Sequence, residues 1–386
     1  MYKIRTLNEI SPIVHEVLEN YLVTAEENAP EAILVRSADM HSLTLPESLL
    51  AVARAGAGVN NIPIEACTQA GIVVFNTPGA NANAVAELVI AAMLLTGRNI
   101  FGGMEWVRGL ADKGADVPKL VEKGKSQFVG PELRGKTLGV LGLGAIGTLV
   151  ANAAIGLGME VLGYDPFISV EHAWALSRSI RRASREELIR RSDFVSVHVP
   201  LSTETRGMFN REMIGIMKPV AALLNFSRGE LVDNTALLEA LAQGHLRAYA
   251  TDFPVAELVG VPGVLCIPHL GASTPESEDN CARMAAEQLR DYLEHGVIRN
   301  SVNLPDVDLP RSEANRLTLV HQNVPKMLEQ ITSLISGDNI NIANMINKSK
   351  GTVAYTVLDI DGQFTPEHIQ KLRILPGMIR VRPIEG

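Results

Sequence analysis

Residues 138–147, with the sequence LGVLGLGAIG, constrain the fold of this chain more than any other segment. An apolar run precedes the glycines and an apolar helical pattern follows them, so they lie where a strand turns into a helix. Gly142 allows the tight turn, Gly144 lets the backbone approach a pyrophosphate, and Gly147 permits close packing of the helix. Free N–H groups and a positive dipole at the helix start favour an anion there. The segment therefore predicts a strand, turn and helix that bind a dinucleotide.

The next predicted strand, residues 160–164, ends at an acidic residue. This residue supports the nucleotide site, because glycine-rich turns also arise by chance in a chain with 32 glycines. Asp165 can accept hydrogen bonds from the ribose hydroxyls of adenosine, and its charge repels a 2′-phosphate. NAD is therefore favoured over NADP. The arginines that follow are interpreted as a solvated helix face; they are Arg178, Arg181, Arg182 and Arg185.

Short apolar runs alternate with helical or turn-rich stretches along most of the chain. They lie at residues 32–35, 50–53, 72–75, 138–141, 161–163, 194–199, 221–226, 248–251 and 264–267. Unbroken apolar strands suit parallel sheets that are covered on both faces. Because 386 residues exceed the size of one hydrophobic core, we expect several domains. The pattern predicts an α/β fold with two Rossmann-like, doubly wound parallel sheets.

The C-terminal part follows a proline-punctuated stretch and has a different pattern. Strands are predicted at 316–320, 354–360 and 378–382, and helices at 325–335 and 366–372, which fits a ferredoxin-like βαββαβ module. The expected domains are 1–92 with 275–305 for the substrate, 93–274 for NAD, a linker at 306–315 and a regulatory domain at 316–386. Two long apolar helices, 85–95 and 276–293, are expected to connect the lobes. Residues 84–96 are also expected to pack against a second subunit of a homo-oligomer, a dimer or a tetramer.

Composition excludes several classes of function. The formal net charge of −8 argues against a nucleic-acid-binding surface and against an electrostatic membrane anchor. No apolar run reaches membrane-spanning length, and no secretory signal is recognised, so a cytoplasmic protein is expected. Cys67, Cys266 and Cys281 include no C-x-x-C pair and are interpreted as reduced, buried thiols. No histidine or cysteine cluster indicates a metal.

Two polar residues at predicted strand ends are candidates for chemistry on a hydroxy acid. Such chemistry needs a cation for the carboxylate and an acid/base for the alcohol proton. Arg228 follows the strand at 221–226, and its planar fork suits a carboxylate. His269 follows the strand at 264–267 and can exchange a proton near neutrality. An isolated histidine is more often structural and a lone arginine more often a surface charge, so neither residue decides the function alone.

Three motifs resemble the signatures of the D-isomer-specific 2-hydroxyacid dehydrogenases. They are NFSRGELVD at 225–233, Asp252 with Glu257 five residues on, and PHLGAST at 268–274. The resemblance implies that Arg228 binds the carboxylate and carbonyl and that His269 is the acid/base. It also implies that Glu257 holds His269 and favours its protonated form.

The resemblance implies further contacts. The cofactor contacts it implies are Thr77, Gly142, Gly144, Ala145, Ile146, Gly147, Tyr164, Asp165, His198, Val199, Pro200, Thr205, Asn225, Phe226, Ser227, Arg228, Asp252, His269, Gly271 and Ala272. Residues 35–37, 54–61 and 76–78 are similar to the branch of the family that oxidises D-3-phosphoglycerate, the entry step of serine biosynthesis. The implied substrate contacts are Arg36, Ser37, Arg54, Ala57, Gly58 and Asn76, with Arg228 and His269. Cations beyond Arg228 suit a phosphorylated substrate.

The C-terminal segments HQNVP at 321–325 and NINI at 339–342 resemble the ACT domain that many such dehydrogenases carry. The resemblance makes His321, Asn323 and Asn341 candidate serine ligands. A module that serves only dimerisation is the alternative. The large side chain of Lys326, where serine-binding domains commonly have glycine, could narrow or close the effector site.

Two further departures from the family pattern affect the cofactor and catalytic sites. Ala145 replaces an arginine that helps to hold the pyrophosphate, and Leu258 replaces the proline that usually follows the glutamate. Two other functions stay open. One is a glyoxylate, hydroxypyruvate or other D-2-hydroxyacid reductase, and the other is a non-enzymatic NAD-sensing corepressor that shares this fold.

Overall fold

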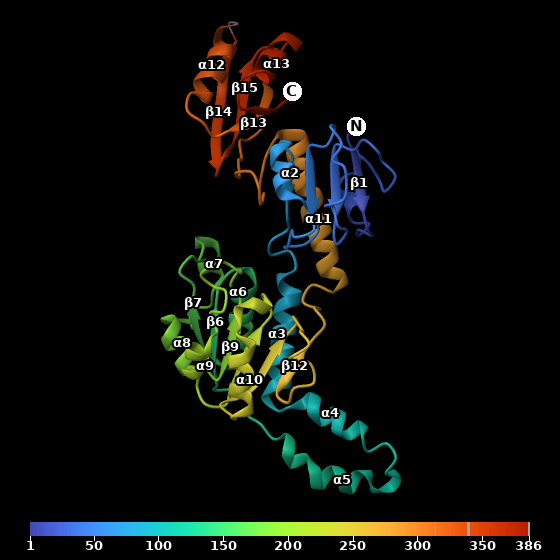
Figure 1. The fold of residues 1–386 in the computed structure, drawn as a ribbon, viewed down its shortest axis with the longest axis vertical. Coiled ribbons are helices and arrows are strands. Elements are labelled where there is room, and N and C mark those ends of the chain that lie inside the picture. The colour runs from blue at the N-terminus through green and yellow to red at the C-terminus, as the bar shows by residue number, and fades with distance from the viewer. Residues whose placement is uncertain (313, 338–339, 385–386) are drawn as a thin grey trace. The chain divides into compact units, whose positions relative to one another are not determined.

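The computed structural model describes residues 1–312, 314–337 and 340–384 and divides into two compact units. Unit 1 combines Met1–Ala80 with Pro275–Gly386, and unit 2 is the continuous stretch Asn81–Thr274. The C-terminal module therefore groups with the N-terminal part of the chain (Figure 1). Residue 313 of the expected linker and residues 338, 339, 385 and 386 of the expected regulatory domain lie outside the described residues.

The N-terminal part of unit 1 is built on a five-stranded parallel sheet in the order β2-β1-β3-β4-β5. Side chains of the inner strands are buried, because the long helix α11 (Pro275–His295) packs on one face and α2 (Ile64–Gln69) on the other. The short helix α1 (Val14–Val17) lies beside α11. The strands are β1 (Lys3–Leu7), β2 (Leu22–Thr24), β3 (Ala32–Val35), β4 (Ala51–Arg54) and β5 (Val73–Phe75).

Unit 2 is built on a seven-stranded parallel sheet in the order β12-β11-β10-β9-β6-β7-β8. Helices α3 (Ala82–Gly97) and α6 (Ala145–Gly156) bury one face, and α8 (Arg185–Arg191), α9 (Arg211–Gly215) and α10 (Asn234–Ala242) bury the other. The strands are β6 (Thr137–Leu141), β7 (Glu160–Tyr164), β8 (Arg181–Arg182), β9 (Phe194–Val197), β10 (Ala221–Asn225), β11 (Leu246–Thr251) and β12 (Val264–Cys266). The two predicted doubly wound parallel sheets are confirmed.

Helix α3 is apolar because unit 2 buries it. Val89, Ala92 and Met93 are fully buried, and the helix packs on α6 and on strands β10 and β11. Its composition therefore does not require a second subunit. All of α3 lies in unit 2, whereas the sequence places the domain boundary at residue 92. Among the described helices, none is by itself long and apolar enough to cross a membrane. Helix α3 passes that test only when it is combined with α4 (Ile100–Arg108), which bends away from it by 67°.

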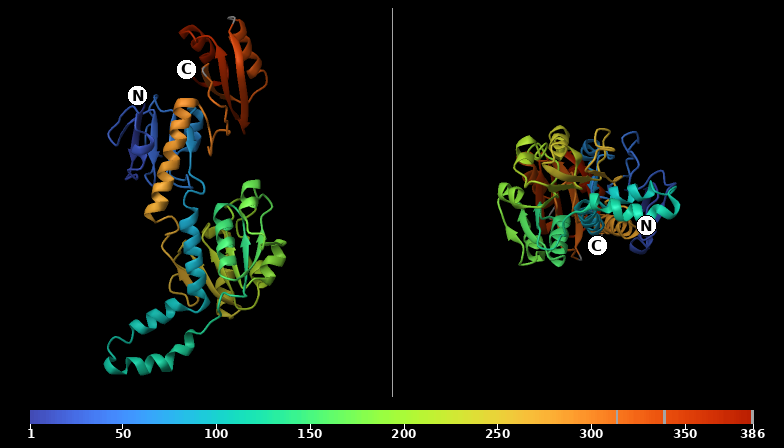
Figure 2. Two further views of the ribbon diagram at one scale, coloured as in Figure 1. Left: turned by 180° about the vertical axis from the view of Figure 1, so that it is seen from behind. Right: turned by 90° about the horizontal axis from the view of Figure 1, so that it is seen from below.

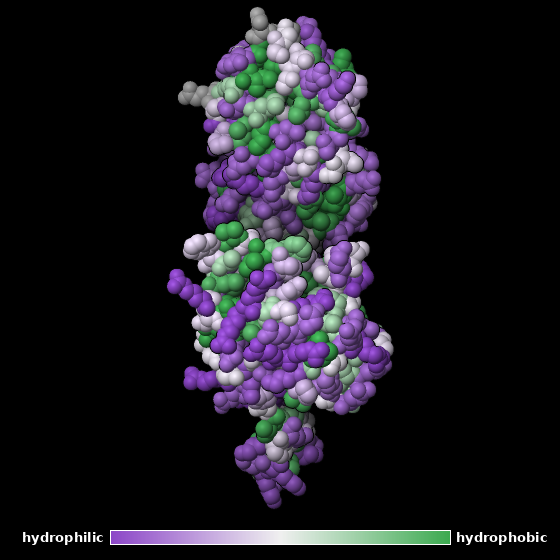
Figure 3. Space-filling view, turned by 90° about the vertical axis from the view of Figure 1, so that its left-hand side faces the viewer, coloured by the Kyte–Doolittle hydropathy of each residue, from purple (hydrophilic) through white to green (hydrophobic). Residues whose placement is uncertain are grey.

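A helical hairpin follows α3 and projects from the body of unit 2 (Figures 1 and 2). It comprises α4, the 3-10 turn Gly114–Asp116, α5 (Val117–Gly124) and the 3-10 turn Lys125–Phe128. Neither α4 nor α5 contains a buried residue. In the space-filling view the hairpin is the narrow projection at the bottom, with hydrophobic side chains among hydrophilic ones (Figure 3).

The C-terminal module of unit 1 is a four-stranded antiparallel sheet in the order β14-β15-β13-β16. Helices α12 (Met327–Gly337) and α13 (Pro366–Arg373) pack on it around their own core. The strands are β13 (Asn315–Gln322), β14 (Asn341–Lys350), β15 (Val353–Asp361) and β16 (Met378–Ile384). The element order is the predicted βαββαβ.

The module binds the C-terminal end of α11. The last carbonyls of a helix have no intrahelical donor and carry a partial negative charge. Arg382 donates to the carbonyls of Tyr292, at 3.0 Å, and of Leu293, and Arg316 donates to the carbonyl of His295 at 2.8 Å. The C-terminal module therefore acts as the cap of this helix.

An ion pair between Arg316 and Asp359 anchors the cap. The Arg316 Nε lies 2.7 Å from an Asp359 carboxylate oxygen, and both side chains are 0% exposed. Arg316 also donates to the carbonyls of Leu309 and Pro310, and Val307 is fully buried. Residues of the expected linker are therefore packed into unit 1. Every donor of the buried guanidinium needs a partner, since desolvating an unpaired charge is costly.

We predict that Asp359→Ala lowers the free energy of unfolding by about 3–5 kcal/mol, because it leaves the Arg316 charge buried and unpaired. Urea denaturation measures the loss. Glu239→Ala is the matched control, because it breaks the solvent-exposed pair between Arg211 and Glu239 and should change stability little. Equal losses in the two variants would contradict the anchoring role of Asp359.

Candidate active site and cofactor site

The loops that follow the strands of unit 2 meet at one edge of its sheet, because all the strands are parallel. Ligands of open α/β sheets bind at this edge, where the strand order reverses. Here the order reverses between β6 and β9. The predicted residues lie after β6 (Gly142), β7 (Asp165), β9 (His198), β10 (Arg228), β11 (Asp252) and β12 (His269).

The glycine turn has the geometry that a pyrophosphate site requires. Gly142 adopts a φ of 88°, and a side chain there would lie 2.4 Å from the carbonyl oxygen of His198. A Cβ on Gly147 would lie 1.9 Å from the carbonyl oxygen of Gly142. A Cβ on Gly144 would meet nothing within 4 Å. The fold itself thus requires glycine at positions 142 and 147, because a side chain there would overlap the backbone. It does not require glycine at position 144, and the open space there fits a phosphate group that approaches the start of α6 at Ala145 and Ile146.

Asp165 holds the glycine turn. One carboxylate oxygen accepts from the Leu143 N–H at 2.8 Å, and the other accepts from the Phe167 N–H at 2.8 Å. Each oxygen has a second lone pair, so the carboxylate keeps the capacity to accept from ribose hydroxyls. Asp165 therefore has a structural role in addition to its predicted cofactor contact.

The loop after β9 is ordered by short hydrogen bonds. Thr205 donates to the carbonyl of Pro200 at 2.7 Å, and Ser227 donates to the carbonyl of Val197 at 2.8 Å. His198 shares a 2.8 Å hydrogen bond with Ser196, and burial lowers the pKa of His198 to about 4. His198 is therefore neutral at pH 7. Its Nδ1 atom is buried and has no protein partner in the described part of the chain.

A cavity of about 460 Å³ adjoins the loops after β10, β11 and β12. The residues that line it include one histidine, His269, and one buried carboxylate, that of Asp252. The lining is Gly229, Glu230, Val232, Asn234, Tyr249, Asp252, Phe253, Pro254, Val255, Leu258 and His269.

His269 is held in a strained backbone conformation with a φ of 34°. Its N–H donates to the Asp252 carbonyl at 3.1 Å, and its ring lies 4.9 Å from the ring of Phe253. Asp252 is 2% exposed, and burial raises the pKa of its carboxyl group while the nearby His269 and the Gly271 N–H oppose that rise. One Asp252 oxygen has no partner among the described protein atoms. Asp252 therefore interacts electrostatically with His269.

Glu257 is exposed and accepts a hydrogen bond from the Asn234 side chain at 2.6 Å. Within the described residues it makes no ion pair or hydrogen bond with His269. Arg228 is also exposed, and its guanidinium donates to the Ser227 carbonyl at 2.6 Å. Sequence reasoning placed Asp252 only among the cofactor contacts. Its position directly after the buried strand β11 was the available signal of a closer relation to His269.

The predicted substrate contacts that lie outside unit 2 come together in unit 1, at the carboxyl edge of the five-stranded sheet. Arg36 follows β3 and Arg54 ends β4, and the Arg54 Nε donates to the Arg36 carbonyl at 2.9 Å. Asn76 donates to the Ala57 carbonyl at 2.7 Å, which orders the loop that contains Gly58. Thr77 is fully buried, and its hydroxyl accepts from the Gly56 N–H at 2.8 Å. Arg36 and Arg54 therefore lie together at this edge of the sheet, next to the ordered loop that contains Gly58.

The three predicted effector residues do not meet within one chain. His321 is buried, and its ring nitrogens contact the Gln322 carbonyl and the Thr356 hydroxyl at 2.8 and 2.9 Å. Asn323 donates to the Gly351 carbonyl, at the same end of the sheet. Asn341 donates to Asp361, which lies at the opposite end of β14 and β15.

Comparison with known proteins shows the family. Residues 90–271 match the model of the D-isomer specific 2-hydroxyacid dehydrogenase, NAD binding domain. D-3-phosphoglycerate dehydrogenase of Escherichia coli K12 is 34% identical over 349 residues, which cover 87% of this chain and 82% of that protein. The chain belongs to the D-isomer-specific 2-hydroxyacid dehydrogenase family. The predicted family resemblance and the predicted cofactor, NAD, are confirmed.

Other members of the 2-hydroxyacid dehydrogenase family show how much of each chain is shared. D-3-phosphoglycerate dehydrogenase of Methanocaldococcus jannaschii is 37% identical over 306 residues, which cover 78% of this chain. The same residues cover only 56% of that longer protein. The NAD⁺-bound 3-phosphoglycerate dehydrogenase of Entamoeba histolytica superposes with a TM-score of 0.60 at 28% identity, covering 78% of this chain and 98% of that one. D-mandelate dehydrogenase of Rhodotorula graminis gives a TM-score of 0.67 at 25% identity, covering 81% and 99%. Together these matches support an NAD-dependent oxidoreductase.

The glycine turn gives a prediction that separates folding from cofactor binding. Gly147→Ala should lower the melting temperature by several degrees, because the new methyl group overlaps the Gly142 carbonyl. Gly144→Ala should fold normally and bind NAD at least tenfold more weakly, because its methyl group enters the space left for the pyrophosphate. Thermal unfolding and NAD titration measure the two effects. Normal NAD affinity in Gly144→Ala would contradict this placement of the cofactor.

Proposed function

We propose that this chain is a cytoplasmic, NAD-dependent dehydrogenase that oxidises D-3-phosphoglycerate to 3-phosphohydroxypyruvate, the first step of serine biosynthesis. The observation that carries the proposal is the pair of arginines at the edge of the unit 1 sheet. A simple 2-hydroxy acid needs one cation for its carboxylate, which Arg228 supplies. Arg36 and Arg54 add two more, which suits a phosphate group. The names of the relatives point to the same substrate.

The chemistry assigned to the chain's own residues is binding and proton transfer. The planar guanidinium of Arg228 binds the substrate carboxylate. A ring nitrogen of neutral His269 accepts the C2 hydroxyl proton as the carbonyl forms. The Asp252 carboxylate favours the protonated imidazole that results. NAD, when bound by unit 2, supplies the hydride acceptor for C2.

The test is a steady-state assay of NADH formation from D-3-phosphoglycerate, with D-glycerate and D-lactate as matched acids that lack the phosphate. Selective turnover of the phosphorylated acid is the expected result. Turnover of only the unphosphorylated acids would replace the proposed substrate while keeping the dehydrogenase. Silence with all three acids, despite NAD binding, would favour an NAD sensor.

We predict that His269→Ala lowers kcat by at least a hundredfold with little change in NAD affinity, because the proton acceptor is lost. Stopped-flow turnover and NAD titration measure the two quantities. Near-normal turnover would remove His269 as the acid/base.

Glu257 and Asp252 compete for the role of the carboxylate that stabilises protonated His269. Oxidation needs neutral His269, so removing a stabilising carboxylate should move the acid limb of the kcat/KM profile to lower pH. Glu257→Gln should move the limb if Glu257 leaves Asn234 for His269 in the substrate complex. Asp252→Asn should move it if the observed arrangement persists.

We further propose that the C-terminal module is an ACT domain that binds serine, and that this site needs two copies. Strand β14 is an edge strand with mostly exposed side chains. Antiparallel pairing of two β14 strands would bring Asn341 of one copy beside Asn323 of the other. Lys326 adopts a φ of 67°, a conformation that favours glycine, three residues after Asn323. If serine is added to the assay, inhibition of NADH formation is the expected result. If serine has no effect, the C-terminal module serves only assembly.

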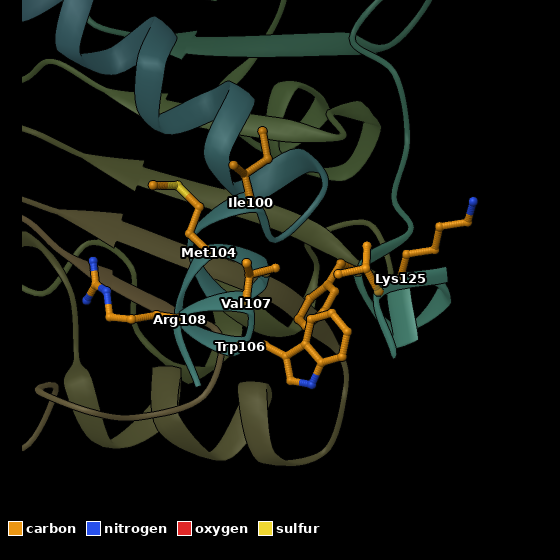
Figure 4. Close-up of a pocket in the computed structure, with 9 residues that line it drawn as sticks. Ile100, Met104, Trp106, Val107, Arg108 and Lys125 are labelled. Atoms are coloured by element: carbon orange, nitrogen blue, oxygen red, sulfur yellow. The ribbon is translucent and has the colours of Figure 1, made fainter. Parts of the chain in front are cut away.

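The helical hairpin is the surface that we propose for assembly. A cavity of about 580 Å³ lies between α4 and α5 and is mostly apolar; it is lined by Ile100, Gly103, Met104, Trp106, Val107, Arg108, Val121, Lys125 and Phe128 (Figure 4). Phe101 is 52% exposed and Met104 is 59% exposed. A hairpin with no buried helical residue cannot cover its own apolar face, so a second copy of the chain is the proposed cover.

Met104→Asp combined with Val107→Asp should therefore lower the mass measured by analytical ultracentrifugation, because charges would be buried at the interface. Leu157→Asp, at an exposed apolar residue elsewhere in unit 2, is the matched control. An unchanged mass in the double variant would exclude the hairpin as the interface.

A further inference from the structure

The guanidinium of Arg36 in unit 1 already contacts a carboxylate. Its Nη2 atom lies 2.6 Å from an oxygen of Glu278, which is in the first turn of α11, 242 residues along the chain. The Arg36 side chain is 39% exposed and that of Glu278 is 41% exposed. Both partners therefore lie at the solvent-facing edge of the sheet, where an anion can reach them.

Glu278 belongs to the same group of side chains as the two arginines. Cys281, one helical turn further along α11, lies close enough to Arg36 and Arg54 to feel their charges, although burial raises the pKa of the Cys281 thiol. The thiol is therefore neutral. Among the contacts that the structure describes, the group holds the guanidinium cations of Arg36 and Arg54 and the Glu278 carboxylate, with Gly56 beside the Arg54 guanidinium.

We propose that Glu278 is an internal counter-ion that competes with the substrate's phosphate for Arg36. This inference rests on the proposed function, because it takes the Arg36 and Arg54 pair as the phosphate-binding part of the site. A carboxylate oxygen of Glu278 occupies a position on the guanidinium that a phosphate oxygen would take. Glu278 thereby weakens the binding of anions at this site.

The solvent exposure of Arg36 and Glu278 indicates whether Glu278 competes with an anion for Arg36 or only holds the Arg36 side chain in place. An ion pair this exposed contributes little stability, so an incoming dianion can displace the carboxylate. The displaced carboxylate stays tethered to α11 and continues to repel a bound anion. A substrate that lacks a phosphate has no group to exchange with Glu278. The effect of Glu278 should therefore depend on the charge of the ligand.

Two variants separate competition from positioning. Glu278→Gln removes the charge but keeps an oxygen that can accept from Arg36, and Glu278→Ala removes both. If Glu278 competes, both variants should lower KM for D-3-phosphoglycerate by about three- to tenfold, with kcat changed less than twofold. If Glu278 only orients Arg36, the alanine variant should raise KM and the glutamine variant should resemble the parent. That second pattern would overturn the proposal.

Glu276→Gln is the matched control. Glu276 lies in the same first turn of α11 and is exposed, so this change removes the same favourable charge at a helix start without touching Arg36. Its KM for D-3-phosphoglycerate should match that of the parent, and its melting temperature should match that of Glu278→Gln. An equal fall in KM in this control would assign the effect to general electrostatics and overturn the specific role.

Titration of the full chain with inorganic phosphate tests the inference without turnover. Phosphate should bind Glu278→Gln about three- to tenfold more tightly than it binds the parent protein. If Glu278→Gln binds phosphate more tightly but the parent protein does not oxidise D-3-phosphoglycerate, the counter-ion role of Glu278 is supported and the proposed substrate is rejected. Equal phosphate affinities, or no phosphate binding in either protein, would overturn the counter-ion.

Discussion

The arrangement of the sites depends on the backbone hydrogen bonds of parallel strands. Parallel pairing places the carboxyl ends of the strands at a common edge, so polar residues that follow distant strands become neighbours. In unit 2 this brings the glycine turn after β6, Asp165 after β7 and His198 after β9 to one edge. In unit 1 it places Arg36 beside Arg54, because Val35 pairs with Arg54 in the ladder. Most of these groups thus follow a strand whose side chains are largely buried, whereas the side chains of β12, which precedes His269, are half-buried.

Most of the buried strands were predictable from the sequence, whereas strand β14 and the hairpin of α4 and α5 were not. Strand β3 is apolar at every position, and β10 is apolar up to Asn225, because helices cover both faces of their sheets. Strand β14 is polar, since it lies at an edge with most side chains in solvent, and only the order of its neighbours implied it. The hairpin of α4 and α5 gave no signal that it would leave the body of unit 2. Contacts within the hairpin, such as that between the rings of Trp106 and Phe128, do not reveal from the sequence whether the hairpin packs on the rest of unit 2.

The candidate site was predictable in its members but not in all of their contacts. Strand ends and motifs identified Arg228, His269 and Asp165. The sequence paired His269 with Glu257, whereas the structure places the buried Asp252 beside His269 and Glu257 on Asn234. The contact between Arg36 and Glu278 joins residues 242 positions apart. Such pairings depend on side-chain direction within the fold, which no local pattern records.

The division of the chain also sets the order in which its parts can fold during synthesis. Residues 81–274 are continuous, and their hydrophobic clusters include only one another, so unit 2 can complete its core as soon as it has emerged. Residues 1–80 are made first, but one face of their sheet is covered by α11 and by side chains of β13 and β15. The sheet of residues 1–80 therefore waits for α11, β13 and β15 before this face is covered, which leaves an apolar surface open to chaperones and to aggregation during synthesis.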